Sequence, residues 1–340
     1  MKVEVFKDEY AEWDAYVKAN DDGTFFHQIG WKQVIERTFG HRPHYLYAEK
    51  DGRICGILPM FTVRSILFGK LLISSPYAVY GGPCAEDRET ETLLLDEAFK
   101  VARKENVKYL ELRNIDNCSY DLPQTDLYVT FRHELPASKE ECLKNIPKSA
   151  RNSAKRALRH GMELETGLNK LETLYRLFAA AMRNLGSPVY PISLMKNIAD
   201  VFSDQVKIFI VKFENKAVAG GMVYAFKDKP IGSYAGSLKE YNQYRVNSFL
   251  YLKIMEYFAE QGCRCFDFSR SRIGSGAYSF KKNWGAQPQP LRYQYYLNRS
   301  KEIPQPNPSN PKFSLPKKIW QNLPLPVTVW LGGKITKHIP

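Results

Sequence analysis

One stretch of the sequence, residues 266–285, brings together residue types that could bind an anionic or carbonyl-containing substrate. It begins in a predicted short strand, residues 265–269, and continues into a turn rich in glycines, hydroxyls and cations. Glycine lets a backbone approach a ligand closely, and arginine or lysine beside free amides makes a site for phosphate or carboxylate. The alternative is a basic surface loop that ends in a packed Trp284. The candidate substrate-binding residues of this stretch are Ser269, Arg270, Gly274 and Gly276.

The chemistry that this stretch could support is the attack of an amine on an ester or thioester carbonyl. Negative charge then develops on the carbonyl oxygen, and the amine must lose a proton. Lys281, beside the Gly274 and Gly276 amides, could stabilise that charge, and Asp267 could orient or deprotonate the amine. The alternative for Asp267 is a carboxylate that caps a loop. The sequence offers no persuasive Ser/His/Asp or Cys/His set, so the substrate's own groups could also contribute.

A second basic feature lies at residues 147–160, which are predicted to form a helix with Pro147 near its start and Gly161 at its end. Three cations recur at every fourth position and therefore share one helix face: Arg151, Lys155 and Arg159. This face is either solvated, as charge runs often are, or a cationic wall that faces a ligand. Arginine suits the second role because its guanidinium can bind phosphate through two hydrogen bonds.

The composition indicates a folded protein with an excess of positive charge. The 340 residues suffice for two domains of ordinary size, and 44% of them are hydrophobic. Lysine and arginine number 49 against 36 aspartates and glutamates, which makes a net charge of +13. That excess favours anionic partners, without choosing among them: nucleic acid, phosphorylated substrates or an anionic membrane face. DNA is not expected, because no motif that reads a DNA sequence occurs.

The N-terminal residues and the cysteines predict a cytoplasmic location. Met1 to Glu4 lead into charged sequence without a secretory signal, and six scattered cysteines lie mostly in apolar runs, as expected in a reducing compartment. Cys263 and Cys265 lack a second pair at ligand spacing, so we expect core cysteines and no metal site. No apolar run reaches the length of a membrane span.

The predicted elements occur twice in the same order, which indicates a tandem duplication of an α/β (α+β) domain, each copy a mixed sheet flanked by helices. The matched pairs are the hairpins 45–58 and 208–224, with Gly56 equivalent to Gly220, the segments Tyr80-Gly81-Gly82 and Tyr234-Ala235-Gly236, the helices 89–105 and 247–261, and the strands 108–113 and 264–269. Tyr234 and Ser237 close a strand of the second copy and could hydrogen-bond a substrate. The predicted domains are 1–145 and 146–300, followed by 301–340.

Residues 301–340 differ in character from the rest of the chain. Residues 303–316 contain five prolines, which is typical of an extended linker. From residue 315 to the end, tryptophan and aliphatic residues alternate with lysines. Such a tail either lies at a membrane interface, as a peripheral contact with the inner membrane, or packs back on the body of the protein.

Several of these motifs together resemble the Fem family, the peptidoglycan interpeptide-bridge aminoacyltransferases and their relatives. The resemblance covers residues 24–296 and looks strongest to the FemAB-like proteins of exopolysaccharide and PEP-CTERM sorting systems. It implies a tandem of domains similar to the GNAT acyltransferases. The residues that carry it are the basic helix, Phe26-His27-Gln28-x-x-Trp31, Tyr234-Ala-Gly-Ser237, Phe266-Asp-Phe-Ser-Arg270 and Phe280-Lys281-x-x-Trp284-Gly285.

The resemblance implies an acyl or aminoacyl transferase that acts on an amine of a phosphate-bearing cell-envelope or exopolysaccharide precursor. In the aminoacyl branch the donor is aminoacyl-tRNA and the acceptor is a nucleotide- or lipid-linked muropeptide. Lys281 would be the family's functional lysine, and the cation that holds the acceptor phosphate would be Arg151 or Lys32. The bridge enzymes often carry a coiled-coil insertion for RNA, whereas this sequence has no long heptad run, so tRNA use stays open.

Acetyl-CoA is the rival donor for such a fold. Acetyltransferases hold its pyrophosphate on an Arg/Gln-x-x-Gly-x-Gly/Ala turn at a helix start. Here Ser271 stands three residues before Gly274, and Tyr80-Gly81-Gly82-Pro83 does not fit either, so acetyl-CoA is disfavoured and no resident cofactor is expected. The alternative function is a non-catalytic module that binds a phosphosugar or lipid precursor in an envelope polysaccharide assembly system.

Overall fold

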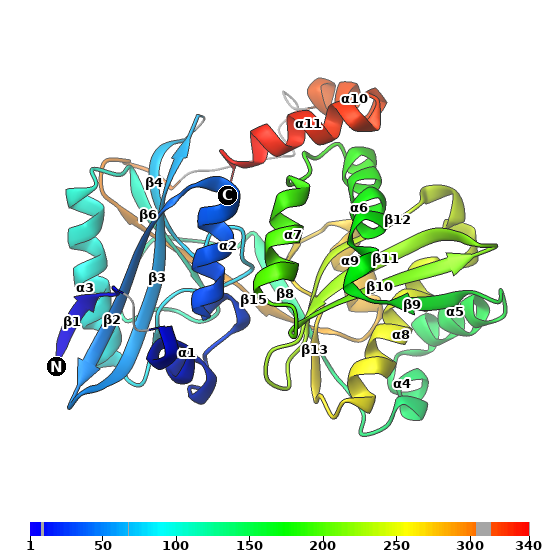
Figure 1. The fold of residues 1–340 in the computed structure, drawn as a ribbon, viewed down its shortest axis with the longest axis horizontal. Helices are drawn as coiled ribbons and strands as arrows, with labels where there is room; N and C mark the ends of the chain where they lie inside the picture. Colours follow the sequence, from blue (N-terminus) through cyan, green and yellow to red (C-terminus); the bar gives the residue numbers. More distant parts are fainter. Residues whose placement is uncertain (8–9, 67, 304–313, 340) are drawn as a thin grey trace. The chain divides into compact units, whose positions relative to one another are not determined.

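The structure is a computed structural model that describes residues 1–7, 10–66, 68–303 and 314–339 (Figure 1). The chain folds into two compact units. Unit 1 comprises Met1–Val129, Pro290–Pro306 and Lys337–Pro340, and unit 2 comprises Thr130–Gln289 and Asn307–Thr336. Among the described residues, none of the helices combines the length and the apolar character that a bilayer span requires.

Unit 1 is a mixed sheet with helices. Its strands lie in the order β1 (Lys2–Val5), β2 (Arg42–Lys50), β3 (Arg53–Ser65), β4 (Gly69–Ser74), β6 (Tyr109–Asn114), β16 (Arg292–Leu297) and β7 (Gln124–Thr125), and β5 (Cys84–Ala85) pairs with β3. Its helices are α1 (Tyr10–Ala19), α2 (Ile29–Phe39) and α3 (Arg88–Lys104). The Asp87 carboxylate caps α3 by accepting a hydrogen bond from the Thr90 amide at 2.7 Å. Leu94, Leu95 and Ala98 of α3 are then buried in the core against the sheet.

Unit 2 repeats this architecture. Its strands lie in the order β9 (Glu163–Thr166), β10 (Val206–Phe213), β11 (Lys216–Tyr224), β12 (Ile231–Ser237), β13 (Cys265–Asp267), β8 (Tyr128–Glu134) and β14 (Ser271–Arg272), and β15 (Gln287–Pro290) pairs with β8. Its helices are α4 (Lys139–Asn145), α5 (Lys148–Leu158), α6 (Leu171–Leu185), α7 (Ile192–Val201), α8 (Val246–Glu260), α9 (Gly276–Asn283), α10 (Ser314–Asn322) and α11 (Leu325–Thr336).

Helices α6 and α8 cover opposite faces of the unit 2 sheet (Figure 1). A methyl group added at Gly220 would meet Leu174 of α6, whereas one added at the next residue, Gly221, would meet Ile254 and Leu250 of α8. Successive side chains of a strand point to opposite faces, so the two helices sandwich β11 between them. The α5 helix packs against α8 on that second face.

The predicted duplication is confirmed. The path β1-β2-β3-β4-β6 in unit 1 corresponds to β9-β10-β11-β12-β13 in unit 2, and each path contains one parallel pair, β4 with β6 and β12 with β13. A helix, α3 or α8, connects the strands of each parallel pair, as a parallel crossover requires. The predicted helix at residues 147–160 is α5, and the predicted helix at 247–261 is α8.

The units divide the chain differently from the predicted bounds 1–145 and 146–300. β8, which follows β6 and the two-residue β7 in the chain, joins the sheet of unit 2 beside β13. β16, from the end of the second repeat, joins the sheet of unit 1 beside β6. Each repeat therefore supplies one strand to the sheet built mainly by the other. A comparison of repeats along the sequence cannot reveal this exchange, because strand pairing is a long-range contact.

One predicted correspondence is wrong. Tyr80-Gly81-Gly82 lies outside any strand, since β4 ends at Ser74. The equivalent of the turn at Tyr234 lies instead at Ser75, directly after β4, because each residue follows the parallel pairing of its strand. Both residues have a positive φ, +39° at Ser75 and +42° at Tyr234, so the two repeats share this backbone turn.

The C-terminal tail packs on unit 2. Both α10 and α11 contact α6, which confirms that the tail folds back on the body of the protein. Most of the predicted proline-rich linker, residues 304–313, lies outside the described residues.

Candidate functional site

The centre of unit 2 is a parallel strand pair that separates. β12 and β13 share one register pair, Ile231↔Asp267, after which β13 ends and β12 continues to Ser237. The ladder of β12 with β11 passes from Met222↔Ser233 to Gly220↔Gly236, so β12 contains one extra residue at Tyr234–Ala235. A bulge of this kind leaves a residue outside the ladder and bends the strand, and bulges are frequent beside active sites.

The Lys281 side chain is held against the loop that follows β13, residues 268–270. Its ammonium donates hydrogen bonds to the carbonyl oxygens of Ser269 at 2.8 Å and Arg270 at 3.2 Å, and the residue is 7% exposed. Burial lowers the pKa of this ammonium to about 8, while the nearby Asp267 carboxylate opposes part of that shift. A lysine in this state is charged at neutral pH and readily gives up its proton.

The Asp267 carboxylate organises the same loop. Its Oδ1 accepts hydrogen bonds from the Thr130 hydroxyl at 2.5 Å and from the Ser269 amide at 2.7 Å, and its Oδ2 lies 3.6 Å from Nε of Arg132. The residue is 2% exposed. These contacts hold Ser269 at φ +66° and so place the carbonyl that Lys281 binds. They favour the loop-capping interpretation of Asp267, and make it a positioning residue for Lys281.

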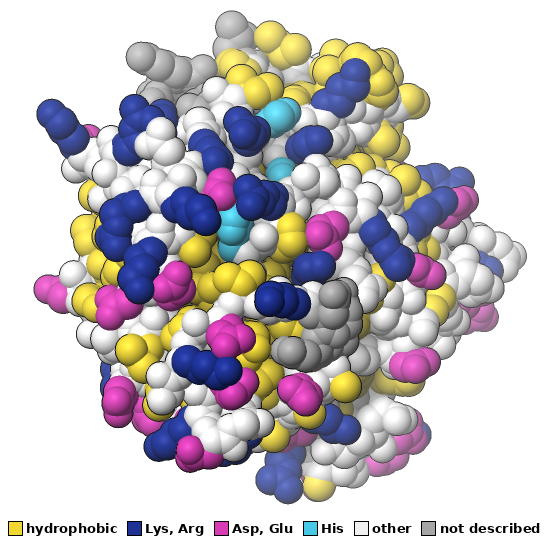
Figure 2. Space-filling view, turned by 60° about the vertical axis from the view of Figure 1, so that its left-hand side comes forward, with side chains coloured by type: hydrophobic (Ala, Val, Ile, Leu, Met, Phe, Trp, Pro, Cys, Tyr) yellow, Lys and Arg dark blue, Asp and Glu magenta, His cyan; other side chains and the backbone are white. Residues whose placement is uncertain are grey.

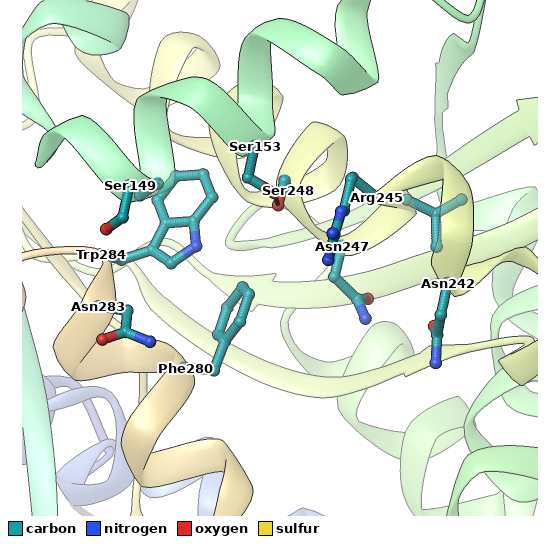
Figure 3. A pocket seen from close by; sticks show the side chains of 11 residues that line it. Ser149, Ser153, Asn242, Arg245, Asn247, Ser248, Phe280, Asn283 and Trp284 are labelled. Atoms are coloured by element: carbon teal, nitrogen blue, oxygen red, sulfur yellow. Dashed lines mark hydrogen bonds between the residues drawn. The ribbon is translucent and has the colours of Figure 1, made fainter.

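At the last turn of α9 lies a pocket of about 390 Å³ with both polar and aromatic lining residues (Figure 3). Three segments line it: the start of α5, the segment that leads into α8, and the last turn of α9. Phe280 and Trp284 form one side, and Asn242, Arg245 and Asn247 lie on the other. The remaining lining residues are Ser149, Ala150, Ser153, Val246, Ser248 and Asn283. The Ser153 and Ser248 hydroxyls are hydrogen-bonded at 2.9 Å, which ties α5 to the start of α8.

The α9 helix connects the two features. Ser275 caps its first turn by accepting a hydrogen bond from the Tyr278 amide at 3.2 Å. Phe280 and Trp284 stand one turn apart with ring centroids 5.8 Å from each other, and Tyr251 of α8 lies 5.4 Å from Phe280. The neighbouring position, Lys281, points into the interior of the unit instead. One rigid helix therefore carries both the buried ammonium and the aromatic wall of the pocket.

The structure brings some of the sequence-predicted site residues together. Asp267, Ser269, Arg270 and Lys281 form the connected loop described above. Gly274 lies in the turn before α9 with φ +78°, and Gly276 is the first residue of α9. Ser237 accepts a hydrogen bond from the amide group of Asn247 at 3.0 Å, which places the end of β12 next to a pocket residue.

Tyr234 packs in an aromatic group at the bulge of β12. Its ring lies 5.4 Å from Phe178, 6.1 Å from Tyr190 and 6.4 Å from Tyr224, measured between centroids. Burial raises the pKa of the Tyr234 phenol well above its usual value, so the hydroxyl stays protonated across the physiological range. The direct role of Tyr234 in substrate binding stays a prediction.

The predicted cations lie elsewhere. The side of α5 that meets the pocket carries Ser149, Ala150 and Ser153, whereas the Arg151 guanidinium donates to the Ile146 carbonyl at 3.1 Å and Lys155 is exposed to solvent. Lys32 belongs to α2 of unit 1, where it pairs with Glu36 at 3.0 Å. Substrate contacts by Arg151, Lys155 and Lys32 therefore stay predictions that this pocket does not support.

The cation that does line the pocket, Arg245, escaped the sequence interpretation. It precedes α8 with φ +61°, and the polar residues Asn242, Asn247 and Ser248 surround it. A signal was present, since a cluster of amides and a cation directly before a helix matches the anion-binding character of helix N-termini. Within the described part of the chain, no cluster of three or more His, Cys, Asp or Glu residues is arranged to hold a metal ion.

The comparison with known families places this site in an acyltransferase domain. Residues 144–282 match the family described as Acetyltransferase (GNAT) domain, and this range includes Lys281 and most of the pocket. The match confirms the prediction of an acyltransferase enzyme. No protein among the curated ones is significantly similar to this chain.

Solved structures share the whole fold. FemX superposes with a TM-score of 0.66 at 16% identity, over 87% of this chain and 98% of FemX. The C-terminal domain of a putative lysylphosphatidylglycerol synthetase from Agrobacterium fabrum gives 0.58 at 15% identity, over 85% and 91%. A tandem GNAT protein from the clavulanic acid biosynthesis pathway gives 0.53 at 11% identity, over 86% and 97%. At these identities the likeness establishes the tandem fold.

Proposed function

We propose that this protein transfers an activated acyl or aminoacyl group to an amine of a phosphate-bearing cell-envelope or exopolysaccharide precursor. The observation that carries the proposal is the double role of α9, which holds the buried Lys281 ammonium and also forms the aromatic wall of the polar pocket. Reacting carbonyl and bound substrate would then be positioned by one rigid element, which is what efficient transfer between two substrates requires.

In the proposed reaction the amine nitrogen attacks the carbonyl carbon of an ester. A C–N bond forms, the ester C–O bond breaks, and the proton released by the amine passes to the leaving oxygen. The charged Lys281 side chain would stabilise the negative charge that develops on the carbonyl oxygen, together with backbone amides at the β12 bulge. Asp267 would hold Lys281 in place through the loop that it caps.

The pocket suits the phosphate-bearing substrate. Arg245 supplies a cation, the start of the 15-residue helix α8 favours negative charge, and Phe280 and Trp284 offer flat apolar surfaces on which a base or sugar ring could stack. The names of two neighbours, FemX and lysylphosphatidylglycerol synthetase, point the same way, toward aminoacyl transfer in the cell envelope.

For the donor we propose aminoacyl-tRNA or another activated acyl group rather than acetyl-CoA, and no resident cofactor. The helix that follows β12 in the chain is α8, and the segment before it, residues 239–245, contains no glycine. It therefore lacks the glycine turn with which acetyltransferases bind pyrophosphate. The enzyme would act in the cytoplasm, on a nucleotide- or lipid-linked precursor, with a peripheral contact to the inner membrane.

The test is transfer of a labelled amino acid from charged tRNA to nucleotide- and lipid-linked muropeptides and to exopolysaccharide precursors. Lys281→Met should lower kcat about a hundredfold, the usual cost of removing one donor to a developing oxyanion. Lys282→Met is the matched control, because Lys282 is the exposed neighbour on the same helix. Full activity of the Lys281→Met variant would contradict the proposed role.

A second function has one observation in its favour. Two backbone carbonyl oxygens accept hydrogen bonds from the Lys281 ammonium and the residue is 7% exposed, as expected of a lysine that only holds a loop. A non-catalytic module would bind a phosphosugar or lipid precursor in the same pocket. Calorimetry would favour this alternative if it shows saturable binding of such a ligand that is lost in the Arg245→Ala variant. The transfer assay would have to show no turnover with any acyl donor.

A further inference from the structure

The last two helices expose the side chains that a folded protein usually buries. α11 buries Thr328, Gly332 and Thr336, which recur at every fourth position, whereas Trp330 on the other side of the helix is 60% exposed. Ile319 of α10 is 55% exposed. Tryptophan is among the side chains most buried on average, and threonine is mostly found at the surface. Buried threonines and an exposed tryptophan reverse the usual pattern, which indicates that a further apolar environment covers the side of α11 that carries Trp330.

The packing of the inner side fixes this orientation. Gly332 lies so close to the Val189 backbone that a Cβ atom there would be 2.7 Å from the Val189 carbonyl oxygen. The buried Thr328 and Thr336 hydroxyls donate to the Leu325 and Gly332 carbonyls of their own helix, each at 2.9 Å. Rotating α11 to bury Trp330 would remove this close contact, so the outward tryptophan is a consequence of the fold.

The outer side combines apolar and cationic side chains. We name it the tail surface, and it consists of Lys318, Ile319, Val327, Trp330 and Lys334. The Lys334 ammonium lies 4.0 Å from the centre of a Trp330 ring, in a cation–π contact. Figure 2 shows hydrophobic and cationic side chains side by side at the upper right of the molecule, over the part where α10 and α11 lie in Figure 1.

The charge around this surface is predominantly positive. No aspartate or glutamate follows Glu302 in the sequence. A pocket of about 520 Å³ adjoins Leu325 at the start of α11, and its charged lining is Glu165 against Lys170, Arg176, Lys212 and Lys216. An occupant of the tail surface must therefore be anionic as well as apolar. Tryptophan, aliphatic residues and lysines on one helix side are the combination found at the interface of an anionic bilayer.

We propose that the tail surface docks this protein on an anionic lipid bilayer. Trp330, Val327 and Ile319 enter the interface, and the lysines contact lipid phosphates. The inference names the part of the chain responsible for the peripheral contact included in the proposed function, and it does not depend on the acyl-transfer reaction. An acidic protein partner is the competing occupant, and the experiment separates the two.

The test is flotation of the full chain with vesicles of phosphatidylcholine plus phosphatidylglycerol and with vesicles of phosphatidylcholine alone. We expect binding to the anionic vesicles that weakens with added salt, because salt screens exposed charges. Trp330→Ala should weaken binding about tenfold, the loss expected for one aromatic side chain. Lys318→Gln and Lys334→Gln should each weaken it about fivefold. Ile66→Ala is the control, because Ile66 is, among the described residues of unit 1, the most exposed large apolar one, at 79%.

A second readout is tryptophan fluorescence. Trp13, Trp31 and Trp284 are buried, so a blue shift on adding anionic vesicles would report mainly the two tail tryptophans, the half-buried Trp320 and the exposed Trp330. The part of the shift that is lost in Trp330→Ala belongs to Trp330. Absence of flotation, equal binding to neutral and anionic vesicles, or equal binding by the Trp330→Ala and Ile66→Ala variants would overturn the proposal. No acyl donor is present in these assays, and Trp330→Ala should keep full transfer to a nucleotide-linked acceptor. A failure of docking and a failure of the proposed reaction are therefore distinguishable.

Discussion

Lys281 is the residue on which the candidate site depends, and its environment distinguishes it from the other cations described at the site. Its ammonium is buried, donates hydrogen bonds to two backbone carbonyl oxygens and lies near the Asp267 carboxylate, whereas the Lys155 and Lys282 side chains are exposed to solvent. Burial of a charge is costly unless hydrogen bonds compensate for it. The loop that Asp267 caps provides those hydrogen bonds, so the two residues work as one structural unit.

The lowered pKa of Lys281 makes protein stability depend on pH in a specific window. Below pH 8 the ammonium is charged in both states, and its burial destabilises the folded state in full. Between pH 8 and the ordinary value of 10.5 the folded state loses the proton first, so the free energy of unfolding rises with pH. The gain relative to Lys281→Met, which lacks the titrating group, should approach about 3 kcal/mol.

The measurement is urea unfolding of the native protein and of the Lys281→Met variant from neutral to alkaline pH. Subtracting the two curves of unfolding free energy against pH removes the contributions of the tyrosines and of the other lysines, which both proteins share. The Lys282→Met variant should run parallel to the native protein throughout. A constant difference between the native protein and Lys281→Met would show that the ammonium is not desolvated in the folded state.

At the scale of elements, the turn that leads into α9 places Lys281 and the pocket wall at the same time. Gly274 holds this turn with φ +78°, a left-handed conformation that is strained for residues with a Cβ atom. Gly276, two residues later, begins the helix and has no atom within 4 Å of where a Cβ would lie. The two glycines were predicted together as substrate-binding positions, yet they differ in what their backbones require.

Alanine substitution separates the two glycines. Gly274→Ala should destabilise the protein by about 1 kcal/mol and lower transfer activity, because the turn must shift α9 to relieve the strain. Gly276→Ala should leave stability within about 0.5 kcal/mol of the native value, since it adds a methyl group into open space at a helix start. Thermal melts and the transfer assay measure both effects. Equal losses in the two variants would argue that the Gly274 turn is not strained by a Cβ atom.

At the scale of the whole molecule, the exchange of strands makes the two repeats depend on each other. β16, residues Arg292–Leu297, lies between β6 and β7 in the unit 1 sheet although it follows the last helix of the second repeat, α9. Its six register pairs with β6 run from Arg292↔Asn114 to Leu297↔Tyr109. Removal of this strand would expose the hydrogen-bonding edge of β6 and the core below it.

A chain that ends at Gln289 should therefore lose the cooperative unfolding of unit 1, while a chain that ends at Glu302 should keep it. Hydrogen exchange at the β6 amides, residues 109–114, is the direct measurement, and it should increase by several orders of magnitude only in the shorter chain. Protection of β6 that is equal in the two chains would contradict the assigned pairing.

The sequence alone determined the features that depend on local order and on repetition: the two copies of one domain, the helices at 147–160 and 247–261, and the segment that holds both Asp267 and Lys281. These follow from periodicity, turn residues and motif spacing, which are properties of neighbouring residues. Only the tertiary structure decided which strands are exchanged, that Arg245 and not Arg151 lines the pocket, and that the tail points Trp330 outward. Each of these depends on contacts between residues far apart in the chain, which no local pattern encodes.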